Sequence, residues 1–596
     1  MCGISGWSLK TSVGINPDIL AGMNATLRHR GPDDSGFFQN ANGTAALSHN
    51  RLSIIDLSQL GHQPMTSSQS GNVLAFNGEI YNFRPLRRQL QGLGHVFTSN
   101  SDSEVLLKSF DEWGMDCVHH LKGMFAFAIW CPREESLFLA RDPMGMKPLY
   151  LWTMSDQKGV AFASEVKAFL QLPGFKREVD RKSLVQYLEF GFSCEANTIF
   201  ENVTKVPPGS WMQLRNGRVE QSTRYFRPGI PERHGSVERK QAVDQLHQTL
   251  DQVVSEHLNA DVPVGVLLSG GLDSSLIAAI AARHSKIQTF TMGFSESSVD
   301  ERPFARKVSS FIGSDHHELE ISPQEITQNL EENVRYFDDI FADWGMVSTR
   351  LLYQKCRQQG IKVVIVGEGA DELFGGYGVF KKSLEGELTG PRLWRLFQLY
   401  RLYAGRRYGD CFFEFSRLMR GYLDESGDDY FHAIRMFEST NQLPNSYVMK
   451  VDKASMAVSV EARVPYLDPR VAELAYRLPR DALISHGSDK ILLRQMAARY
   501  RLLPDEIINR EKFGAPLAIS WMDDSPGFRS YARESILSRD GWTDTLGLRR
   551  AMEDYFDKKK TGYAFPRSIS LFRNLAWRLL LLNLWSKHYL SAAYGN

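Results

Sequence analysis

The feature that most constrains the fold is an apolar run followed at once by a glycine turn and an alanine-rich stretch. Residues 264–268 have the composition of a buried strand, and residues 274–282 that of a helix. The segment between them reads Ser-Gly-Gly-Leu-Asp. A turn of small residues that opens a helix presents unpaired N–H groups and the positive end of the helix dipole, which together favour phosphate. The carboxylate of Asp273 in such a cradle predicts a cation between them, Mg²⁺.

This turn differs from the phosphate loop of kinases and GTPases, because no Gly-Lys-Ser/Thr follows it. It resembles the PP-loop of ATP pyrophosphatases, enzymes that cleave ATP to AMP and pyrophosphate while they activate a carboxylate or a related group. The alternative is a tight strand-to-helix turn whose glycines serve only packing, and the rest of the chain has to decide between the two.

Bulk properties restrict the class of protein. A chain of 596 residues is too long for one ordinary core and predicts at least two domains. A formal net charge of +1 gives no reason to expect nucleic acid or an anionic membrane as partner. The most apolar stretch, 575–585, is interrupted by polar residues and too short to span a bilayer, so a buried C-terminal helix is expected. The chain also starts without a basic and apolar leader.

Six cysteines in a chain of this length do not form a disulfide framework, and no pair of them has metal-ligand spacing. Free thiols in a reducing cytosol are therefore expected, which predicts a cytoplasmic protein. Of the six, Cys2 has a position that suggests a chemical role. Removal of Met1 would leave Cys2 with a free α-amine, and an amine with a pKa of about 8 can take the proton of the thiol near neutral pH. One residue would then supply nucleophile and base together.

Further motifs follow in the N-terminal half. They are Arg-His-Arg-Gly-Pro-Asp at 28–33, Arg-Leu-Ser-Ile at 51–54, Asn-Gly-Glu-Ile-Tyr-Asn at 77–82, Ser-Asp-Ser-Glu at 101–104, an apolar run at 123–130, and Arg-Asp-Pro-Met-Gly-Met-Lys-Pro-Leu-Tyr at 141–150. In this order they resemble the N-terminal-nucleophile glutaminase domain of class II glutamine amidotransferases. Together with the turn at 269–275, the chain resembles the glutamine-hydrolysing asparagine synthetase family from end to end.

The resemblance implies a role for each motif residue of the first domain. Cys2 is the nucleophile, Asn77 and Gly78 stabilise the oxyanion, Arg51 binds the carboxylate of glutamine, and Glu79 and Asp102 bind its ammonium group. The residue types suit these tasks: an amide and a main-chain N–H are oxyanion donors, and a guanidinium binds a carboxylate through two parallel hydrogen bonds. Each residue taken singly is an ordinary exposed charge or turn residue, and only their joint spacing favours function.

Composition predicts a β-rich first domain, with short apolar runs between Gly, Asn and Pro turns and a hairpin whose turn is Asn216-Gly217. The family's fold is an αββα sandwich of antiparallel sheets. A polar run places the boundary at 228–238, so the predicted domains are a glutaminase domain at 1–228 and an ATP pyrophosphatase domain at 238–596.

In the second domain, apolar strands alternate with helical stretches, which predicts an α/β fold with a parallel sheet, followed by a helical C-terminus. The clearest strand, 361–366, runs into an acidic loop with Glu368 and Asp371. Ligands of such sheets bind at the carboxyl ends of the strands, so Asp273 and Asp371 are expected to share Mg²⁺. A zinc site at His316-His317 is not expected, because the side chains of adjacent residues diverge and the resemblance implies no metal there.

The resemblance implies the remaining site residues. ATP contacts are expected from Leu267, Ser269, Gly270, Gly271, Asp273, Ser274, Met292 and Gly367. Glu368 is the expected general base toward the attacking nitrogen, and Lys490 the cation over the phosphates and the acyl-adenylate.

The implied activity is a glutamine-dependent and ATP-dependent amidation of a carboxylate, with AMP and pyrophosphate as products and a homodimer as the assembly. L-aspartate is the first acceptor expected, and a uronic acid sugar or a secondary-metabolite carboxylate is the alternative. The sequence departs from the family pattern at three positions that the resemblance places near ATP or the acceptor. Val366 replaces the usual Ser or Thr, Trp344 stands where small residues are common, and Phe513 lies in an altered Lys-x-Gly motif. Two other interpretations are a relative that closes a ring with an internal amine in place of ammonia, and a catalytically inactive scaffold. Cys2 argues against the first, and the intact set of motif residues argues against the second.

Overall fold

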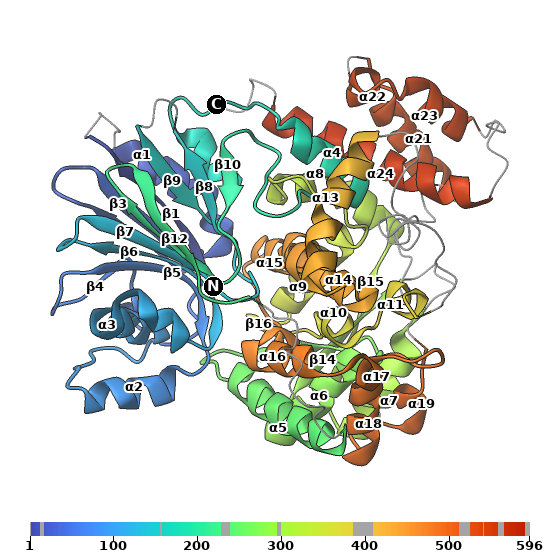
Figure 1. Ribbon diagram of the computed structural model, residues 1–596, viewed down its shortest axis with the longest axis horizontal. Helices are drawn as coiled ribbons and strands as arrows, with labels where there is room; N and C mark the ends of the chain where they lie inside the picture. The colour runs from blue at the N-terminus through green and yellow to red at the C-terminus, as the bar shows by residue number, and fades with distance from the viewer. Residues whose placement is uncertain are drawn as a thin grey trace.

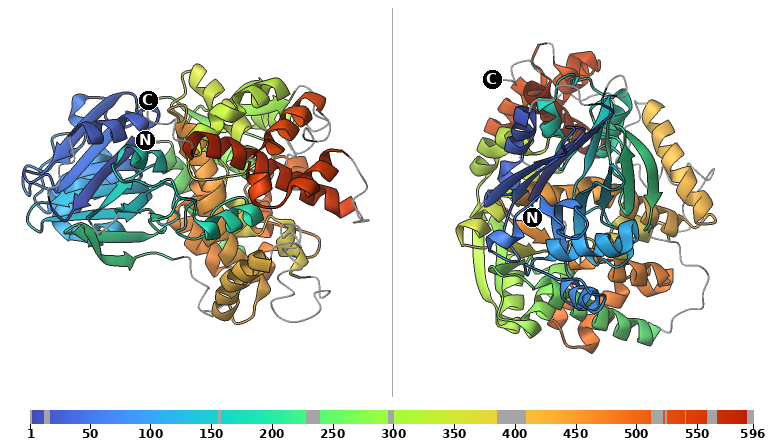
Figure 2. Two further views of the ribbon diagram at one scale, coloured as in Figure 1. Left: turned by 90° about the horizontal axis from the view of Figure 1, so that it is seen from above. Right: turned by 90° about the vertical axis from the view of Figure 1, so that its left-hand side faces the viewer.

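Two halves of the chain lie side by side in the computed structural model (Figure 1 and Figure 2). One half ends at residue 227 and the other begins at residue 239, so the predicted boundary at 228–238 lies outside the described residues. The structure describes residues 2–11, 17–154, 158–227, 239–294, 300–384, 409–511, 522, 525–539, 541–557 and 566–590.

The N-terminal half is a four-layer sandwich around two antiparallel sheets. The first sheet has the order β10 (Val203–Lys205), β8 (Tyr150–Thr153), β9 (Gly159–Ala163), β1 (Cys2–Leu9), β3 (Ala45–Arg51), β2 (Asp34–Gln39). The second has the order β12 (Arg218–Arg224), β11 (Ser210–Arg215), β7 (Ser136–Arg141), β6 (Gly123–Cys131), β5 (Val73–Ile80), β4 (Met65–Thr66). β1 contacts β5, so the sheets pack face to face. The predicted αββα fold is confirmed.

Helices cover the outer faces of both sheets in this half. α1 (Pro17–Thr26) packs on β1 and β3, and α3 (Asp102–Trp113) packs on β5 with α2 (Phe83–Gly92) beside it. All nine residues of β6 are buried because both of its faces are covered. The predicted hairpin turn joins β11 to β12, with positive φ at both Asn216 and Gly217 as a two-residue turn of this kind requires.

The C-terminal half is built on one parallel sheet, as the alternation of strands and helices predicts. Its strand order is β15 (Asp315–Ile321), β14 (Gln288–Phe294), β13 (Val264–Leu267), β16 (Val363–Ile365), β17 (Glu461–Arg463). β16 is shorter than the predicted strand 361–366, because the N–H of Ile361 bonds to the carbonyl of Cys356 at the end of the preceding helix. β13 and β16 lie side by side, so the loops that follow them meet at one edge.

Helices lie on both faces of the parallel sheet (Figure 1). α5 (Arg239–His257), α6 (Leu272–His284) and α7 (Arg302–Ile312) lie on one side, and α9 (Met346–Gln358) and α15 (Val448–Met456) on the other. Among the described residues, the other α-helices of this half with eight or more residues are α8 (Pro323–Tyr336), α13 (Gly409–Glu425), α14 (Tyr430–Phe437), α16 (Pro469–Arg477), α18 (Ile491–Arg499), α21 (Pro526–Ile536), α23 (Arg549–Phe556) and α24 (Pro566–Tyr589), and a π-helix spans Glu438–Tyr447.

The C-terminal helix α24 contains the apolar stretch 575–585 and is a buried helix, as predicted. Trp577 and Trp585 are each only 1% exposed. The guanidinium of Arg578 donates to the carbonyls of Leu188 and Glu189 at the end of α4 (Arg181–Phe190), so α24 also binds the N-terminal half. Among the residues that the structure describes, none of the helices combines the length and apolarity needed to cross a bilayer.

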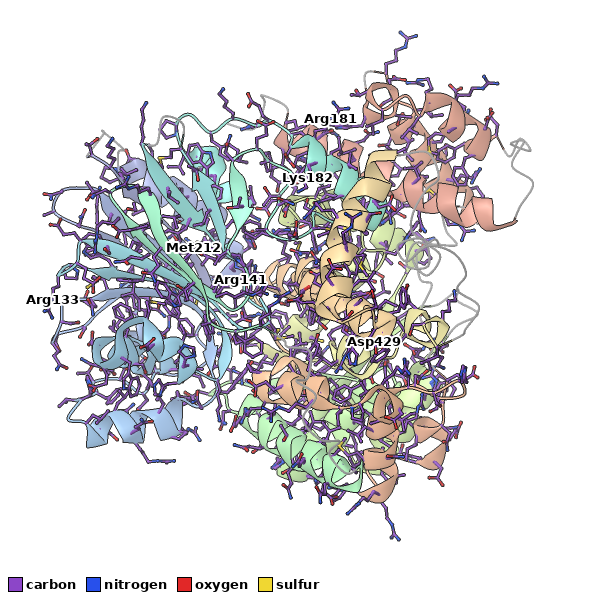
Figure 3. The ribbon with its side chains drawn as sticks, in the orientation of Figure 1. Arg133, Arg141, Arg181, Lys182, Met212 and Asp429 are labelled. Atoms are coloured by element: carbon purple, nitrogen blue, oxygen red, sulfur yellow. The ribbon has the colours of Figure 1, made fainter. Side chains whose placement is uncertain are left out.

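Buried ion pairs join the two halves. Asp452 on α15 pairs with Arg30 at 2.8 Å and with Lys147 at 3.4 Å. β7 runs from the outer edge near Arg133 to this interface, where it ends at Arg141 (Figure 3). The guanidinium of Arg141 donates three hydrogen bonds of 2.8 Å to main-chain carbonyls and so fixes the connections around it. The interface is therefore ordered by charge as well as by apolar packing.

Candidate active sites

The first site lies where β1 begins. The main-chain nitrogen of Cys2 donates to Oδ1 of Asn77 on β5 at 3.0 Å. Asn77 is fully buried, and among the described residues its Nδ2 has no hydrogen-bond partner. A buried amide N–H without a partner carries a desolvation cost that an oxyanion would remove. The structure thus brings together Cys2 and Asn77, two residues that the resemblance assigns to one site.

His49 on β3 is a neighbour of Cys2 that the sequence reasoning missed. The register of β1 and β3 sets Ile4 opposite His49 and Cys2 opposite Arg51, so His49 lies diagonally across from Cys2. Burial acts to raise the pKa of the Cys2 thiol, but the charge and hydrogen bond of His49 oppose it and the pKa falls to about 7. The signal was available, since His49 and Arg51 are two residues apart and so share one face of the strand.

The predicted glutamine-binding residues surround Cys2. Arg51, Gly78, Glu79 and Asp102 line a cavity of about 30 Å³ together with Cys2. A water molecule needs about 10–15 Å³ of such space, so the cavity holds about two waters and a larger ligand requires its walls to move. Part of the wall is formed by the segment that follows Arg51.

The guanidinium of Arg51 is supported by that segment. It donates to the carbonyls of Ile55, Asp56 and Ser58. Gly61 lies against the same group, since a Cβ at this position would be 2.0 Å from Nη2 of Arg51. The position of the predicted carboxylate-binding fork is therefore set by the conformation of residues 55–61.

Both predicted ammonium-binding carboxylates are buried and have raised pKa values. Asp102 lies at the start of α3, and burial raises its pKa to about 6 although the N–H of Ile80 donates to it at 3.0 Å. Burial, and then the nearby charge of Asp102, raise the pKa of Glu79 well above its usual range, while Arg463 of the other half acts to lower it at a distance of 3.2 Å. A bound cation such as an ammonium group would stabilise both carboxylates in their charged form.

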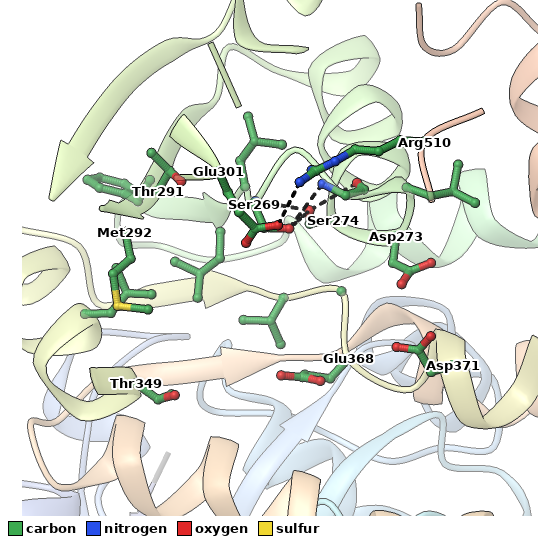
Figure 4. A pocket seen from close by; sticks show the side chains of 18 of the residues that line it. Ser269, Asp273, Ser274, Thr291, Met292, Glu301, Thr349, Glu368, Asp371 and Arg510 are labelled. Carbon is green, nitrogen blue, oxygen red and sulfur yellow. Dashed lines mark hydrogen bonds and ion pairs between the residues drawn. The ribbon is translucent and has the colours of Figure 1, made fainter. Parts of the chain in front are cut away.

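The second site is a cavity of about 330 Å³ at the carboxyl ends of β13, β14 and β16 (Figure 4). Of the residues predicted to bind ATP, the metal or the attacking nitrogen, those that line it are Leu267, Ser269, Gly271, Asp273, Ser274, Met292, Gly367, Glu368 and Asp371. The carboxylates of Asp273, Glu368 and Asp371 come from the two segments that follow β13 and β16, and all three border this one pocket (Figure 4). The cavity is also lined by Glu301, Thr349, Tyr353 and Arg510, to which the sequence assigned no role.

Gly270 is the predicted ATP contact that does not line the cavity. Its φ is +71°, and a Cβ there would lie 2.6 Å from the main-chain nitrogen of Ala305 on α7. Its carbonyl accepts a hydrogen bond of 3.0 Å from Arg510. Gly270 therefore makes the turn and the close packing possible, whereas a Cβ on Gly271 would meet only the hydroxyl of Ser269.

The turn itself is held by two hydroxyl groups. The Oγ atoms of Ser269 and Ser274 lie 2.9 Å apart, and Ser274 Oγ accepts from the N–H of Ser269 at 3.2 Å. α6 starts directly after Gly271, which has no side chain that could cap the first N–H groups of the helix. An anion in the pocket would meet this uncapped helix start.

Lys490 joins the segments that carry Asp273 and Asp371 through ion pairs. Its Nζ pairs with Asp371 at 2.6 Å and also with Asp273. The φ of Lys490 is +48°, an uncommon conformation for a residue with a side chain. Gly376 makes the approach possible, because a Cβ there would lie 1.8 Å from Oδ1 of Asp371 and 2.2 Å from Cε of Lys490. Sequence reasoning missed Gly376.

Asp273 and Asp371 bind one Nζ, so a single cation reaches both carboxylates. This fits Mg²⁺, which usually takes one or two carboxylates and completes its shell with phosphate oxygens and water. Among the described residues there is no cluster of three or more His, Cys, Asp or Glu side chains placed to hold a metal by themselves.

Trp344, expected to shape the acceptor side, is not among the residues that line the cavity. Its ring stacks on Trp577 of α24 at 4.4 Å, and its Nε1 donates to Asn574 at 3.2 Å. A large ring next to a buried helix removes more apolar surface from water there than it would beside a polar cavity. Of the other departures, Val366 lines the cavity and Phe513 lies outside the described residues.

Comparison with known proteins gives matches over both halves. The profile of the family described as "Asparagine synthase" matches residues 245–587, and that of "Glutamine amidotransferase domain" matches residues 1–226. "Asparagine synthetase [glutamine-hydrolyzing] 1" of Bacillus subtilis is 32% identical over 563 residues, which cover 87% of each chain. "Asparagine synthetase [glutamine-hydrolyzing] 3" of the same organism is 30% identical over 634 aligned positions and covers 99% of each chain. "Amidase chry2" of Gibberella zeae is 33% identical over 373 residues, or 60% of this chain and 54% of the other.

Proposed function

Since the chain belongs to the family of glutamine-hydrolysing asparagine synthetases, we propose that it transfers the amide nitrogen of glutamine to L-aspartate at the expense of ATP. The family makes it a glutamine-dependent amidotransferase and a carbon–nitrogen ligase that uses ATP. The observation that carries the choice of acceptor is its identity of 30% over 99% of its length to a protein named asparagine synthetase. A different carboxylate acceptor is the second candidate, favoured by the relative named an amidase and by Val366 in the pocket wall.

In the proposed glutaminase reaction, the Cys2 thiolate attacks the side-chain carbonyl of glutamine. The α-amine of Cys2, free once Met1 is removed, takes the thiol proton and returns it to the departing nitrogen, so that a thioester forms and ammonia leaves. Nδ2 of Asn77 and the N–H of Gly78 donate to the oxygen that becomes negative. Water then cleaves the thioester to glutamate and restores the thiol.

Recognition of glutamine is assigned to the charged residues of the small cavity. The fork of Arg51 binds the α-carboxylate, and Glu79 and Asp102 bind the α-ammonium. Both carboxylates have raised pKa values before glutamine binds, and the bound cation favours their charged form.

In the proposed synthetase reaction, an oxygen of the acceptor carboxylate attacks the α-phosphorus of ATP, and pyrophosphate leaves. Ammonia then attacks the acyl carbon, AMP leaves, and Glu368 takes the proton released by the nitrogen. Lys490 stabilises the negative charge of both transition states. Asp273 and Asp371 are the proposed ligands of Mg²⁺, which when bound neutralises charge on the leaving pyrophosphate.

The proposed compartment is the reducing cytosol. The described cysteines, which are Cys2, Cys117, Cys131, Cys194 and Cys356, are all buried free thiols, and the nucleophile requires the reduced state. A homodimer stays a prediction from the family resemblance, and light scattering of the purified protein tests it.

The test is AMP formation with ATP, Mg²⁺ and glutamine across a panel of aspartate, uronic acids and their nucleotide sugars, with mass detection of the amide. Asparagine from aspartate is expected, with one AMP per amide. Ammonia should replace glutamine in a Cys2→Ala variant, since only the first site is removed. Amide from another carboxylate, and none from aspartate, would overturn the choice of acceptor. Absence of both glutamine hydrolysis and AMP would favour an inactive scaffold.

A further inference from the structure

Arg463 connects the two sites through its main chain and its side chain. It is fully buried and ends β17, the last strand of the parallel sheet. Its carbonyl accepts a hydrogen bond of 2.9 Å from the N–H of Val366, the residue before the loop with Glu368. Its guanidinium leaves the sheet toward the N-terminal half and pairs with Glu79 at 3.2 Å and with Glu461 at 2.5 Å.

The same guanidinium holds a second segment of its own half. Nη1 donates to the carbonyls of His257, the last residue of α5, and of Asn259, in the connection from α5 to β13, each at 2.7 Å. Two residues further on, Asp261 accepts a hydrogen bond of 2.8 Å from the N–H of Asp56 and donates its own N–H to Ile54 at 3.0 Å. The connection thus reaches across the interface to the wall of the small cavity.

These contacts support both sides of the proposed glutamine-binding surface, the one for the carboxylate and the one for the ammonium group. The carbonyl of Asp56 is one of those that support the guanidinium of Arg51. Glu79 is one of the two carboxylates assigned to the ammonium group, and Arg463 is the cation that opposes the effect of burial on its charge. The carboxylate-binding and ammonium-binding sides are therefore both fixed by residues of the other domain.

We propose that Arg463 and Asp261 are positioning residues of the glutamine site, so that the synthetase domain sets the geometry in which glutamine is bound. Neither residue touches the reacting atoms. Arg463 holds Glu79 in place, and Asp261 holds the segment on which the fork of Arg51 rests. Because two distant groups of glutamine must be bound at once, loss of either support lowers affinity for glutamine more than it lowers the chemical step.

The inference rests on the proposed glutaminase activity and is tested with Asp261→Ala and Arg463→Lys in the full chain. Asp261 is exposed, so the first variant keeps the core intact, and the second keeps the charge of Arg463 but removes its fork. We expect KM for glutamine to rise about tenfold or more in both, with kcat changed by less than about threefold. AMP formation supported by ammonia should stay within about twofold of the wild type in Asp261→Ala, because no contact of Asp261 reaches the ATP cavity.

Arg417→Ala is the matched control, because it breaks another contact between the halves, an ion pair of 2.7 Å with Glu195, without touching the glutamine site. Its KM for glutamine should equal that of the wild type. An unchanged KM in Asp261→Ala, or a parallel loss of glutamine-supported and ammonia-supported turnover in that variant, would overturn the inference alone. A wild-type protein that hydrolyses no glutamine would overturn the proposed function, and the inference with it.

Discussion

The reactivity of Cys2 depends on side chains from neighbouring strands. Burial alone would hold the thiol protonated, and His49 offsets this so that the pKa of Cys2 is about 7. The main-chain nitrogen of Cys2 is fixed by Asn77, so the groups of the proposed nucleophile and base are held in one orientation. Asp102 adds a second titrating group, with a pKa of about 6.

We expect kcat/KM for glutamine hydrolysis to fall as the pH drops through about 7, because the Cys2 thiol takes up a proton and loses its nucleophilic form. Below about 6 the fall should steepen, because protonated Asp102 no longer attracts an ammonium group. Initial rates measured from about pH 5 to 9 give this profile.

Two variants separate the contributions to that profile. His49→Asn should move the fall in rate to higher pH, because the residue that lowers the thiol pKa is gone. Asp102→Asn should weaken glutamine binding and remove the steeper part below about 6. A rate that does not change between about pH 6 and 8 would contradict the assignment of Cys2.

At the scale of elements, the proposed ATP cavity depends on the segments that follow adjacent parallel strands. Asp273 lies in the first turn of α6, which follows β13, and Asp371 in the first turn of the short helix α10 (Ala370–Phe374), which follows β16. Lys490, just before α18, binds both. Gly376, after α10, leaves the space in which Lys490 meets Asp371. Elements that are far apart in the chain thus form one charged cluster.

Gly376→Ala should abolish this arrangement, because its methyl group would overlap the carboxylate of Asp371 and displace Lys490. We expect AMP formation with ammonia to fall about 100-fold or more, the size of effect that misplacement by about 1 Å can cause. Gly378→Ala is the control, since a Cβ there has no neighbour within 4 Å. Equal activity of the two variants would show that Lys490 does not need its present position.

Local patterns predicted the elements and the residues of each motif, because strands, turns and helix starts depend on neighbours in sequence. They identified β13, the turn and α6, and the cysteine at the start of β1. They could not pair Glu79 with Arg463, since 384 positions separate the two and neither pattern contains the other. The stacking of Trp344 on Trp577 could not be predicted for the same reason, since Trp577 lies in a distant helix.

At the scale of the whole molecule, charge is buried between the two halves. Asp452 is 2% exposed and is the shared partner of Arg30 and Lys147. Buried ion pairs add little net stability compared with apolar packing, but removal of one partner leaves a buried charge without compensation. The halves are therefore bound in a way that is sensitive to single substitutions.

Asp452→Ala should destabilise the protein by about 3–5 kcal/mol, because Arg30 and Lys147 then keep their charges inside the interface without Asp452. The free energy of unfolding in urea, followed by tryptophan fluorescence, measures the change. Glu195→Ala, which removes a more exposed ion pair with Arg417 at the same interface, should cost less than about 1 kcal/mol. Similar losses of unfolding free energy in the two variants would show that burial does not determine the cost of removing an ion pair.

Synthesis on the ribosome delivers the partners of the Glu79–Arg463 ion pair far apart in time. The 384 positions between them take about 20–80 s to translate at about 5–20 residues per second. During that interval the growing chain already contains Cys2, Arg51 and Asn77, but it has neither Asp261 nor Arg463 at first, and Arg463 arrives last. If Asp261 and Arg463 position the glutamine site as proposed, a nascent chain binds glutamine more weakly until both residues have been synthesised.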